Sequence, residues 1–115
     1  MSGEFASIIE YAVDGPATQR ELVAAFVPLL HRWVAGHPGY VSARFHASTD
    51  GLRVSNVVTW ASEAHYRAFL DTSDTPGRLA AIEAALAALS GTTEYAVPGA
   101  PTYRVLAEVG PVAGT

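Results

Sequence analysis

The stretch VSNVVTWASEAHY, residues 54–66, reads as a β-strand that continues directly into a short helix. Four residues alternate along the strand and project from one face of the sheet: Val54, Asn56, Val58 and Trp60. Because two of the four are aliphatic, apolar groups should cover this face and bury Asn56, whose amide then needs hydrogen bonds from protein, water or a ligand. At a rise of roughly 3.3 Å per residue, Asn56 and Trp60 lie about 13 Å apart, about the length of a fused polycyclic aromatic ligand. The other interpretation is an asparagine bonded to the backbone beside a core tryptophan.

Length and composition restrict the classes of protein to which the chain can belong. Its 115 residues suffice for one domain with a core, and no apolar run approaches the roughly 20 residues of a membrane span. The chain has no cysteine, which excludes disulfides, thiolate metal sites and cysteine nucleophiles. Its net charge is −4 and its seven basic residues do not cluster, which argues against nucleic acid and anionic membranes as partners. The acidic N-terminus lacks a signal-peptide pattern, so we expect a soluble, cytoplasmic protein.

Alternation and breaker residues along the remaining chain predict eight elements. In order they are a strand at 5–13, a helix at 16–36, strands at 39–49 and 52–60, a helix from Glu63, a helix from Pro76 to near Gly91, and strands at 93–97 and 102–109. A hairpin turn at Thr49-Asp50-Gly51, with Asp-Gly supplying positive φ angles, should pair the second and third strands antiparallel. This order predicts an α+β, ferredoxin-like fold: an antiparallel sheet with helices on one face.

Several local features of these elements can be predicted in more detail. The long helix has two competing starts, Gly15-Pro16 and a Thr18–Glu21 capping box, and Pro28 should kink it or divide it into two abutting helices. Two faces alternate on the second strand: one holds Val41, Ala43, Phe45 and Ala47, and the other holds Tyr40, Ser42, Arg44, His46 and Ser48. In the later helices, the residues expected to face inward are Tyr66, Phe69, Leu70, Leu79, Ile82, Leu86 and Leu89, and the expected N-caps are Ser62 and Thr75.

The face of the sheet that points away from the helices is also apolar. Its residues in the first and third strands include Ala6, Ile8, Ala12 and Val57. A lone subunit would expose them, and such an apolar patch usually marks an interface. We therefore expect a sheet-to-sheet homodimer, a dimeric α+β barrel, with the C-terminal strand as a candidate for crossing to the partner. Each subunit is expected to be a single domain, residues 1–115, with its core at about 5–109 and a loose tail at 110–115.

Most catalytic constellations are missing from the sequence. The four histidines fall on separate elements without ligand-like spacing, so we expect no metal site. There is no glycine-rich phosphate loop, no nucleophile elbow and no pair of carboxylates. What remains is a possible cavity between sheet and helices, lined by neutral polar and aromatic groups. Such a cavity suits binding and polarising an aromatic substrate better than hydrolysis.

Four parts of the chain carry a family resemblance. They are VDGPATQ (13–19), PGYVSA (38–43), FHASTDG (45–51) and the set Asn56, Trp60, Ser62-Glu63 and Tyr66-Arg67. Together they resemble the antibiotic biosynthesis monooxygenase family, over roughly residues 11–70. The asparagine–tryptophan pair alone is a weak motif, and the long matching stretches make the resemblance specific.

The resemblance implies a dimeric ferredoxin-like enzyme of antibiotic biosynthesis. It implies oxidation of a polycyclic aromatic polyketide, an anthrone or a phenolic naphthacenone, to a quinone with O2 and with no cofactor: no flavin, haem or metal. By this likeness, Asn56 donates a hydrogen bond to the carbonyl or enolate oxygen of the substrate. The indole N–H of Trp60 donates to an oxygen of substrate, superoxide or peroxide, and Tyr66 contacts a ring hydroxyl. An electron-rich phenolate can reduce O2 itself where the protein favours its ionised form and excludes water.

Four further residues are candidates for binding the substrate: Arg78, His46, Phe45 and Phe69. The resembled family carries an arginine on the helix before the last strands, and this chain has none at 80–86. Arg78 would reach the same cavity from a different register, or else it is solvated in the first turn of its helix. His46 lies on the strand face opposite Phe45, where it is an interface residue if that face forms the dimer; the alternative interpretation makes it a base.

Three other functions stay open. Haem-degrading relatives need an axial histidine on the later helix, and no histidine follows Arg67 in this chain. An aromatic polyketide cyclase would bind similar substrates but would act without O2. A non-catalytic small-molecule-binding module would show altered affinity, and no turnover, in Asn56→Ala and Trp60→Phe variants.

Overall fold

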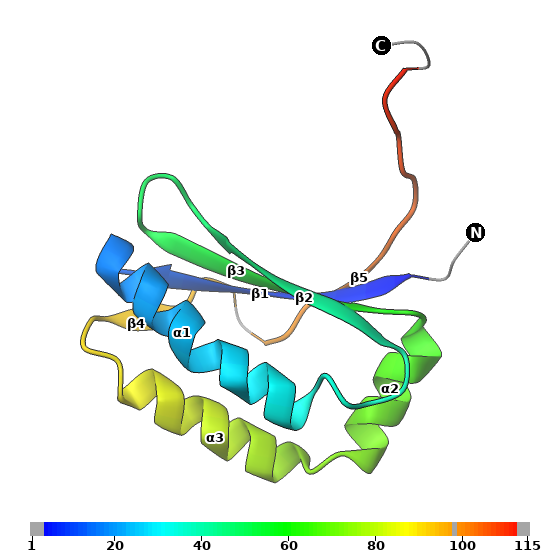
Figure 1. The fold of residues 1–115 in the computed structure, drawn as a ribbon, viewed down its shortest axis with the longest axis horizontal. Helices are drawn as coiled ribbons and strands as arrows, with labels where there is room; N and C mark the ends of the chain where they lie inside the picture. The colour runs from blue at the N-terminus through cyan, green and yellow to red at the C-terminus, as the bar shows by residue number, and fades with distance from the viewer. Residues whose placement is uncertain (1–3, 98, 113–115) are drawn as a thin grey trace.

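The computed structural model describes residues 4–97 and 99–112 and shows an α+β fold (Figure 1). Its described part contains the elements β1 (Phe5–Val13), α1 (Pro16–Trp33), β2 (Tyr40–Ala47), β3 (Arg53–Trp60), α2 (Glu63–Thr72), α3 (Thr75–Ala87), β4 (Thr93–Tyr95) and β5 (Thr102–Arg104). All strand pairs are antiparallel, and α1 and α3 lie on the same side of the sheet, which confirms the predicted ferredoxin-like arrangement. None of these helices combines the length and the apolar character that crossing a membrane requires.

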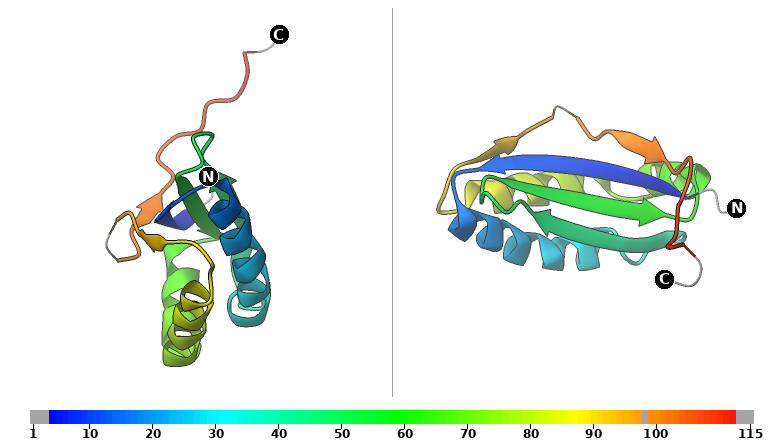
Figure 2. Two further views of the ribbon diagram at one scale, coloured as in Figure 1. Left: turned by 90° about the vertical axis from the view of Figure 1, so that its left-hand side faces the viewer. Right: turned by 90° about the horizontal axis from the view of Figure 1, so that it is seen from above.

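β1 runs through the centre of the sheet, whose strand order is β2-β3-β1-β4. One edge of β1 pairs with β3, from Phe5 opposite Trp60 to Ala12 opposite Arg53. The other edge is shared by two short strands, because β4 pairs with the Val13 end and β5 with the Phe5 end. Figure 2 shows β4 and β5 along the same side of β1. β2 and β3 form the predicted hairpin, which leaves β2 at the edge of the sheet.

The core lies between the sheet and the helices. The buried residues of β1 and β3 are those that the alternation predicts: Phe5, Ser7, Tyr11, Val13, Val54, Asn56, Val58 and Trp60. Two clusters of buried apolar residues form under the one sheet. The Tyr11 cluster consists of Tyr11, Val13, Leu22, Phe26 and Val54. The Trp60 cluster consists of Val34, Val58, Trp60 and Phe69.

α1 is one continuous helix, so the division into two helices at Pro28 is wrong. Of the two competing starts, the helix uses Gly15-Pro16 and has no side-chain cap. The Thr18–Glu21 capping box is wrong because both side chains bond elsewhere: Thr18 Oγ1 donates to the carboxylate of Asp14, and Glu21 accepts hydrogen bonds from Ser90. These bonds tie the first turns of α1 to neighbouring loops instead of to the helix itself.

A β-bulge at Val41 changes the faces of β2 from those predicted. The pairing with β3 shifts register between Tyr40 and Ser42, which leaves Val41 as the extra residue. Tyr40 is thereby brought to the helix side of the sheet, where its ring meets the Trp60 indole edge-on, and Val41 is 52% exposed. The faces predicted for these two residues are wrong, whereas the strand keeps its predicted faces from Ala43 onward.

Turns and helix caps follow the predictions in part. In the hairpin, Gly51 has the predicted positive φ, 83°. Asp50 does not, because no described residue other than glycine has a positive φ. Ser62 caps α2 as predicted by accepting a hydrogen bond from the His65 N–H. α3 is capped by Asp74 instead of Thr75. Two leucines expected to face inward are exposed: Leu70 and Leu79.

The last two strands are shorter than predicted, and the chain beyond them leaves the body of the molecule. β4 ends at Tyr95, two residues before the predicted end at Val97, and β5 ends at Arg104, five residues before the predicted end at Val109. Residues 105–112 have no regular structure and extend away from the sheet (Figure 1). Three apolar side chains of this segment are largely exposed: Leu106, Val109 and Val112. Of the tail predicted at 110–115, the last three positions lie outside the described residues.

Candidate active site

Asn56 and Trp60 lie on the helix-facing side of β3 with Val58 between them. Both side chains are buried, with Asn56 4% and Trp60 1% exposed. Each carries a buried polar atom without a hydrogen-bond partner, the amide oxygen Oδ1 of Asn56 and the indole nitrogen Nε1 of Trp60. A buried polar atom left unsatisfied typically costs about 1–3 kcal/mol. The interpretation of an asparagine satisfied by the backbone therefore fails for this oxygen, and one face of β3 holds an unmet acceptor and an unmet donor.

Aromatic rings from β2 and α2 enclose the Trp60 indole. Phe69 lies at 4.9 Å between ring centroids, Tyr40 at 5.9 Å and Tyr66 at 6.1 Å, the latter two edge-on. α2 thus brings two predicted site residues onto Trp60, with Phe69 buried and Tyr66 half-buried. Tyr40 is the residue that sequence reasoning misses, because simple alternation places it on the other face and no residue type in the sequence marks the bulge.

Arg78 of α3 joins this group, so the interpretation of a solvated arginine is wrong. Its side chain is 9% exposed, and its guanidinium carbon lies 4.4 Å from the Phe69 ring centroid. Its N–H groups donate to the hydroxyls of Ser73 at 2.8 Å and Thr75 at 3.3 Å. Burial lowers the pKa of Arg78 from its ordinary value, and the nearby Tyr66 opposes this shift. Since arginine stays protonated in proteins, a buried positive charge lies against Phe69.

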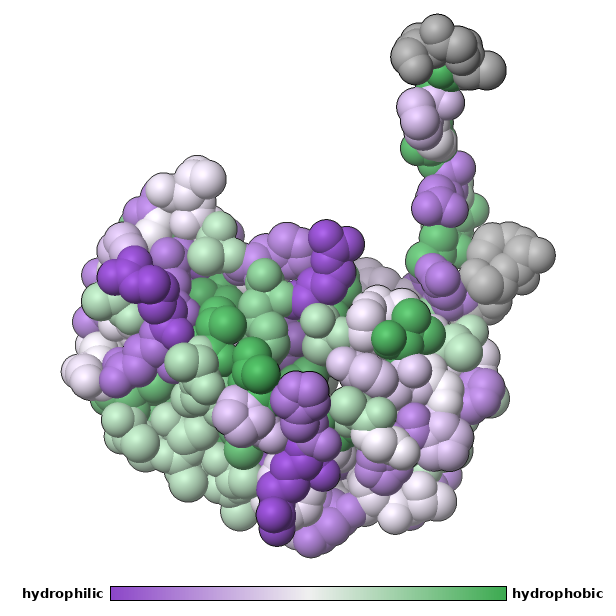
Figure 3. Space-filling model, viewed as in Figure 1, coloured by the Kyte–Doolittle hydropathy of each residue, from purple (hydrophilic) through white to green (hydrophobic). Residues whose placement is uncertain are grey.

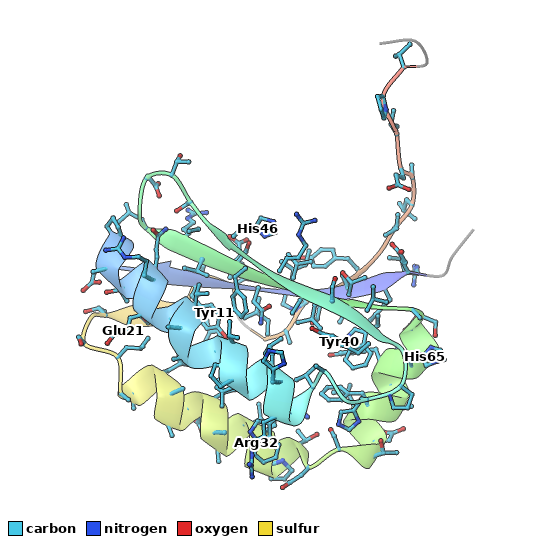
Figure 4. All side chains as sticks on the ribbon, in the orientation of Figure 1. Tyr11, Glu21, Arg32, Tyr40, His46 and His65 are labelled. Carbon is cyan, nitrogen blue, oxygen red and sulfur yellow. The ribbon has the colours of Figure 1, made fainter. Side chains whose placement is uncertain are left out.

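The adjacent residues Phe45 and His46 lie on opposite sides of the sheet. Phe45 pairs with Asn56 across the strands and packs against the Tyr11 cluster. His46 pairs with Ser55 and is exposed on the side away from the helices, as Figure 4 shows. This placement contradicts a role for His46 in binding substrate beside Asn56, because the sheet separates the two side chains. His46 as an interface residue stays a prediction.

Tyr11 is a residue of the core rather than an acid or base. It is 2% exposed, and its ring lies 5.2 Å from that of Tyr95. Burial raises the pKa of the Tyr11 hydroxyl well above its ordinary range, and the charge and hydrogen bond of Tyr95 act in the same direction. Tyr11 is therefore neutral across the physiological range of pH.

A small hollow borders this group from the side of α1. Its volume is about 160 Å³, and its wall consists of Val27, Leu30, His31, Ala35, Tyr40, Ala43 and Phe45. Among the described residues, no group of three or more His, Cys, Asp or Glu side chains is placed to hold a metal ion. The site is therefore built of rings, one buried cation and two unmet polar atoms, which suits an aromatic ligand with oxygen substituents on which charge develops.

Known proteins resemble this chain, although no family model matches it. Tetracenomycin-F1 monooxygenase of Streptomyces glaucescens is 45% identical over 53 residues, which are 46% of this chain and 47% of that protein, so the match spans about half the length of that relative. The crystal structure of a monooxygenase from the gene ActVA-Orf6 of Streptomyces coelicolor, in complex with the ligand nanaomycin D, is 32% identical, covers 96% of this chain and 94% of its own, and superposes with a TM-score of 0.72.

A further solved structure is SnoaB, a cofactor-independent oxygenase of Streptomyces nogalater, which is 21% identical and covers 99% of this chain and 100% of its own with a TM-score of 0.55. At that identity the likeness shows the fold alone. The 32% identity with the Streptomyces coelicolor protein extends over nearly the full length of both chains. On that similarity, together with the Asn56–Trp60 face and the ferredoxin-like sheet, this chain belongs to the antibiotic biosynthesis monooxygenase family.

Proposed function

We propose that this chain is a single-domain, cofactor-independent monooxygenase that oxidises a polycyclic aromatic polyketide, of the anthrone or phenolic type, to a quinone with O2. The observation that carries the proposal is the pair of unmet polar atoms, Asn56 Oδ1 and Trp60 Nε1, on one buried face of β3. The relatives support it, since two of them are monooxygenases and one of these was solved with nanaomycin D bound.

The reaction balances without a cofactor because the substrate supplies the electrons. The anthrone methylene loses two hydrogens, one atom of O2 becomes the new carbonyl oxygen, and the other leaves as water. Loss of a proton first gives an electron-rich anion, which passes one electron to O2. The two radicals combine at the same carbon, and the O–O bond breaks as water is eliminated. The protein then has to favour the anion, hold it beside O2 and exclude water.

Asn56 and Trp60 would meet oxygen substituents at the two ends of such a ligand. The unmet Asn56 oxygen accepts, so it suits a phenolic hydroxyl of the substrate, and turning the amide by 180° presents its NH2 group to a carbonyl or enolate oxygen. The indole N–H of Trp60 is a donor only, so it suits an oxygen on which negative charge develops. Because the donor is fixed and desolvated before the reaction, it stabilises that charge without reorganising.

Tyr66 and Arg78 would favour the ionised form of the substrate. Arg78 lies against one side of Phe69, and Phe69 in turn packs on Trp60 with 4.9 Å between ring centroids. A positive charge in a desolvated setting lowers the pKa of a nearby phenol. Tyr66 lies within electrostatic reach of Arg78, so its hydroxyl would contact a ring oxygen beside that charge.

We also propose a cytoplasmic homodimer. The sheet face without helices carries Ala6, Ile8, Ala12 and Val57, all partly exposed in the subunit. The segment 105–112 extends from the sheet with apolar side chains exposed, and eight residues reach up to about 26 Å, far enough to lie on a second subunit. Light scattering should give twice the 12.1 kDa of one chain, and a mass of one chain at micromolar concentration would contradict the dimer.

Oxygen uptake with the simple anthrone dithranol tests the proposed activity. After subtraction of the spontaneous rate, we expect uptake that neither a chelator nor added flavin changes. Asn56→Ala and Trp60→Phe should each lower the rate by about 10²–10³, as removal of a fixed donor typically does. Leu79→Ala, at an exposed position on α3, is the matched control and should keep the wild-type rate.

Three outcomes would contradict the proposal. Folded protein that shows no uptake above background is not an anthrone oxygenase. Conversion of a polyketide substrate under strictly anaerobic conditions would indicate a cyclase of the same fold. Saturable binding of the anthrone without turnover, with affinity altered in the Asn56 and Trp60 variants, would indicate a binding module.

A further inference from the structure

We infer that the hollow between α1 and β2 is where the substrate enters and where its distal ring rests, with Tyr40 and Phe45 as an aromatic gate between this hollow and the Asn56–Trp60 face. The inference rests on the proposed function for the identity of the ligand. It assigns binding roles to Tyr40, Val27 and His31, none of which belongs to the group predicted from the sequence.

The hollow has the chemistry of a ring-binding site. Its walls are the flank of α1 and the edge strand β2, and they are apolar except for His31 and the hydroxyl of Tyr40. Figure 3 shows apolar side chains gathered over α1 beside the edge of the sheet, where the surface is hollowed. Val27, on the rim, is 40% exposed, so the hollow opens to solvent. A polycyclic phenol would place its rings on the aliphatic wall and an oxygen substituent toward His31.

The gate follows from the register of the two strands. Phe45 pairs with Asn56, and Tyr40 pairs with Trp60. Each of the two aromatic residues that line the hollow is therefore the cross-strand neighbour of a residue with an unmet polar atom. Tyr40 contacts both sides directly, because it lines the hollow and its ring meets the Trp60 indole edge-on at 5.9 Å. A ligand in the hollow therefore lies one aromatic side chain away from Asn56 Oδ1 and Trp60 Nε1.

Passage of a polycyclic substrate from the hollow to the Asn56–Trp60 face requires the gate to move. An apolar cavity of about 150 Å³ is enough to bind one benzene ring. The hollow measures about 160 Å³, so it holds one ring of a polycyclic substrate, and the others need space that Tyr40 and Phe45 now fill. The surrounding backbone favours such movement: β2 is an edge strand with a bulge beside Tyr40, and Pro28 removes a hydrogen bond from the facing stretch of α1.

A unique thiol on the rim tests binding in the hollow without requiring turnover. The chain has no cysteine, so Val27→Cys carries one thiol, and Leu79→Cys places a similar exposed thiol on α3 as the matched control. The probe is 1,8-dihydroxyanthraquinone, the quinone that dithranol oxidation yields. At ten times its Kd, the probe should slow alkylation of Cys at position 27 by N-ethylmaleimide about tenfold and leave the control unchanged. Equal alkylation with and without the bound probe would overturn the inference.

The same two variants link the hollow to catalysis. Alkylation of Val27→Cys with pyrene maleimide should lower kcat/KM for dithranol on the order of tenfold or more relative to the unlabelled variant, mainly through KM. The labelled Leu79→Cys protein should keep its kcat/KM. Dithranol turnover that is unaffected by a pyrene at position 27 would overturn the inference and leave the proposed function standing. Protection at position 27 in a protein that takes up no O2 would support the hollow as a ring-binding site and overturn the proposed function.

Discussion

The two halves of the core differ in how their polar groups are satisfied, although one sheet covers both. Beside the Tyr11 cluster, Gln19 Nε2 donates to the backbone carbonyls of Ser48 at 3.0 Å and Arg53 at 2.8 Å, which ties α1 to the hairpin. The other half consists of the Trp60 cluster and Asn56, which precedes Val58 by two residues on the same face of β3. There, Asn56 Oδ1 and Trp60 Nε1 have no partner. The exception in the Tyr11 half is the hydroxyl oxygen of Thr93 on β4, which is also unmet.

This difference separates stability from binding within one small core. Bonded polar groups fix α1 on the hairpin in the Tyr11 half, so that half positions the sheet. The Trp60 half carries unsatisfied atoms whose unfavourable free energy a ligand with oxygen substituents would relieve on binding. Substitutions in the two halves should therefore separate loss of stability from loss of activity.

The largest effect on stability is expected from truncation in the Tyr11 cluster. Phe26 is 2% exposed and meets Tyr11 edge-on, with 5.6 Å between ring centroids. Phe26→Ala should lower the free energy of unfolding by about 3–5 kcal/mol, since the cavity it leaves is enclosed. Urea denaturation measures this, with Leu79→Ala at an exposed position as the control. A loss below about 1 kcal/mol would show that this half does not carry the stability assigned to it.

Loss of the buried amide in the Tyr11 half should come next. Gln19→Met keeps the length of the side chain but removes the donor to two backbone carbonyls, so the free energy of unfolding should fall by about 1–3 kcal/mol. Arg20→Met, on the exposed neighbouring position, controls for the new methionine. Equal denaturation midpoints for the two variants would mean that the Gln19 bonds contribute nothing measurable.

The corresponding change in the Trp60 half should have the opposite sign. Asn56→Leu replaces a buried amide with an unmet oxygen by an apolar group of similar shape. The free energy of unfolding should stay unchanged or rise by up to about 2 kcal/mol, while oxygen uptake with dithranol is lost. Destabilisation as large as that of Gln19→Met would indicate that Asn56 serves the fold, and the contrast between the two halves would fail.

The smallest effect is a pH dependence that belongs to the Tyr11 half. The hydrogen bond from Thr18 lowers the pKa of the Asp14 carboxyl, and the backbone N–H of Thr92 adds to this shift. A lowered pKa in the fold means that Asp14 stabilises the protein above the ordinary carboxyl pKa of about 3.9, and that this stabilisation disappears as the pH falls through the lowered value. Asp14→Asn should therefore be less stable than the wild type at pH 7, and the difference should vanish as the pH falls through the lowered pKa of Asp14. A difference that is constant with pH would rule out ionisation as its source.

Local patterns were enough to predict the sheet and to identify most residues of the candidate site. Alternation along β1 and β3 divides each strand into two faces, and it places Asn56 and Trp60 on the same face as Val54 and Val58, which is the face that is buried. Ser62 is found as a cap because its side chain bonds within its own helix. These features depend on residues close together in the sequence.

The features that the sequence does not reveal depend on contacts between distant residues. The bulge at Val41 is set by the register against β3, so no pattern within β2 predicts that Tyr40 faces the helices. Arg78 is buried because the Phe69 ring of another helix covers its guanidinium, whereas helix periodicity alone leaves it in an exposed first turn. The face of α3 that packs on the core includes Arg78, one position before the leucine that helix spacing suggests. Leu79 is therefore exposed.

The central place of β1 also sets the order in which the chain can fold during synthesis. β1 is the first strand to be made, yet its partner β3 is complete only at Trp60, 47 residues after Val13, roughly 2–9 s later at ribosomal speed. The other edge of β1 stays unpaired for longer, until β4 and β5 have been synthesised. α1 follows β1 at once, so this helix is the first cover for an apolar strand whose single charge is Glu10. Nascent chains stalled before Trp60 are therefore the species most exposed to pairing with one another through β1.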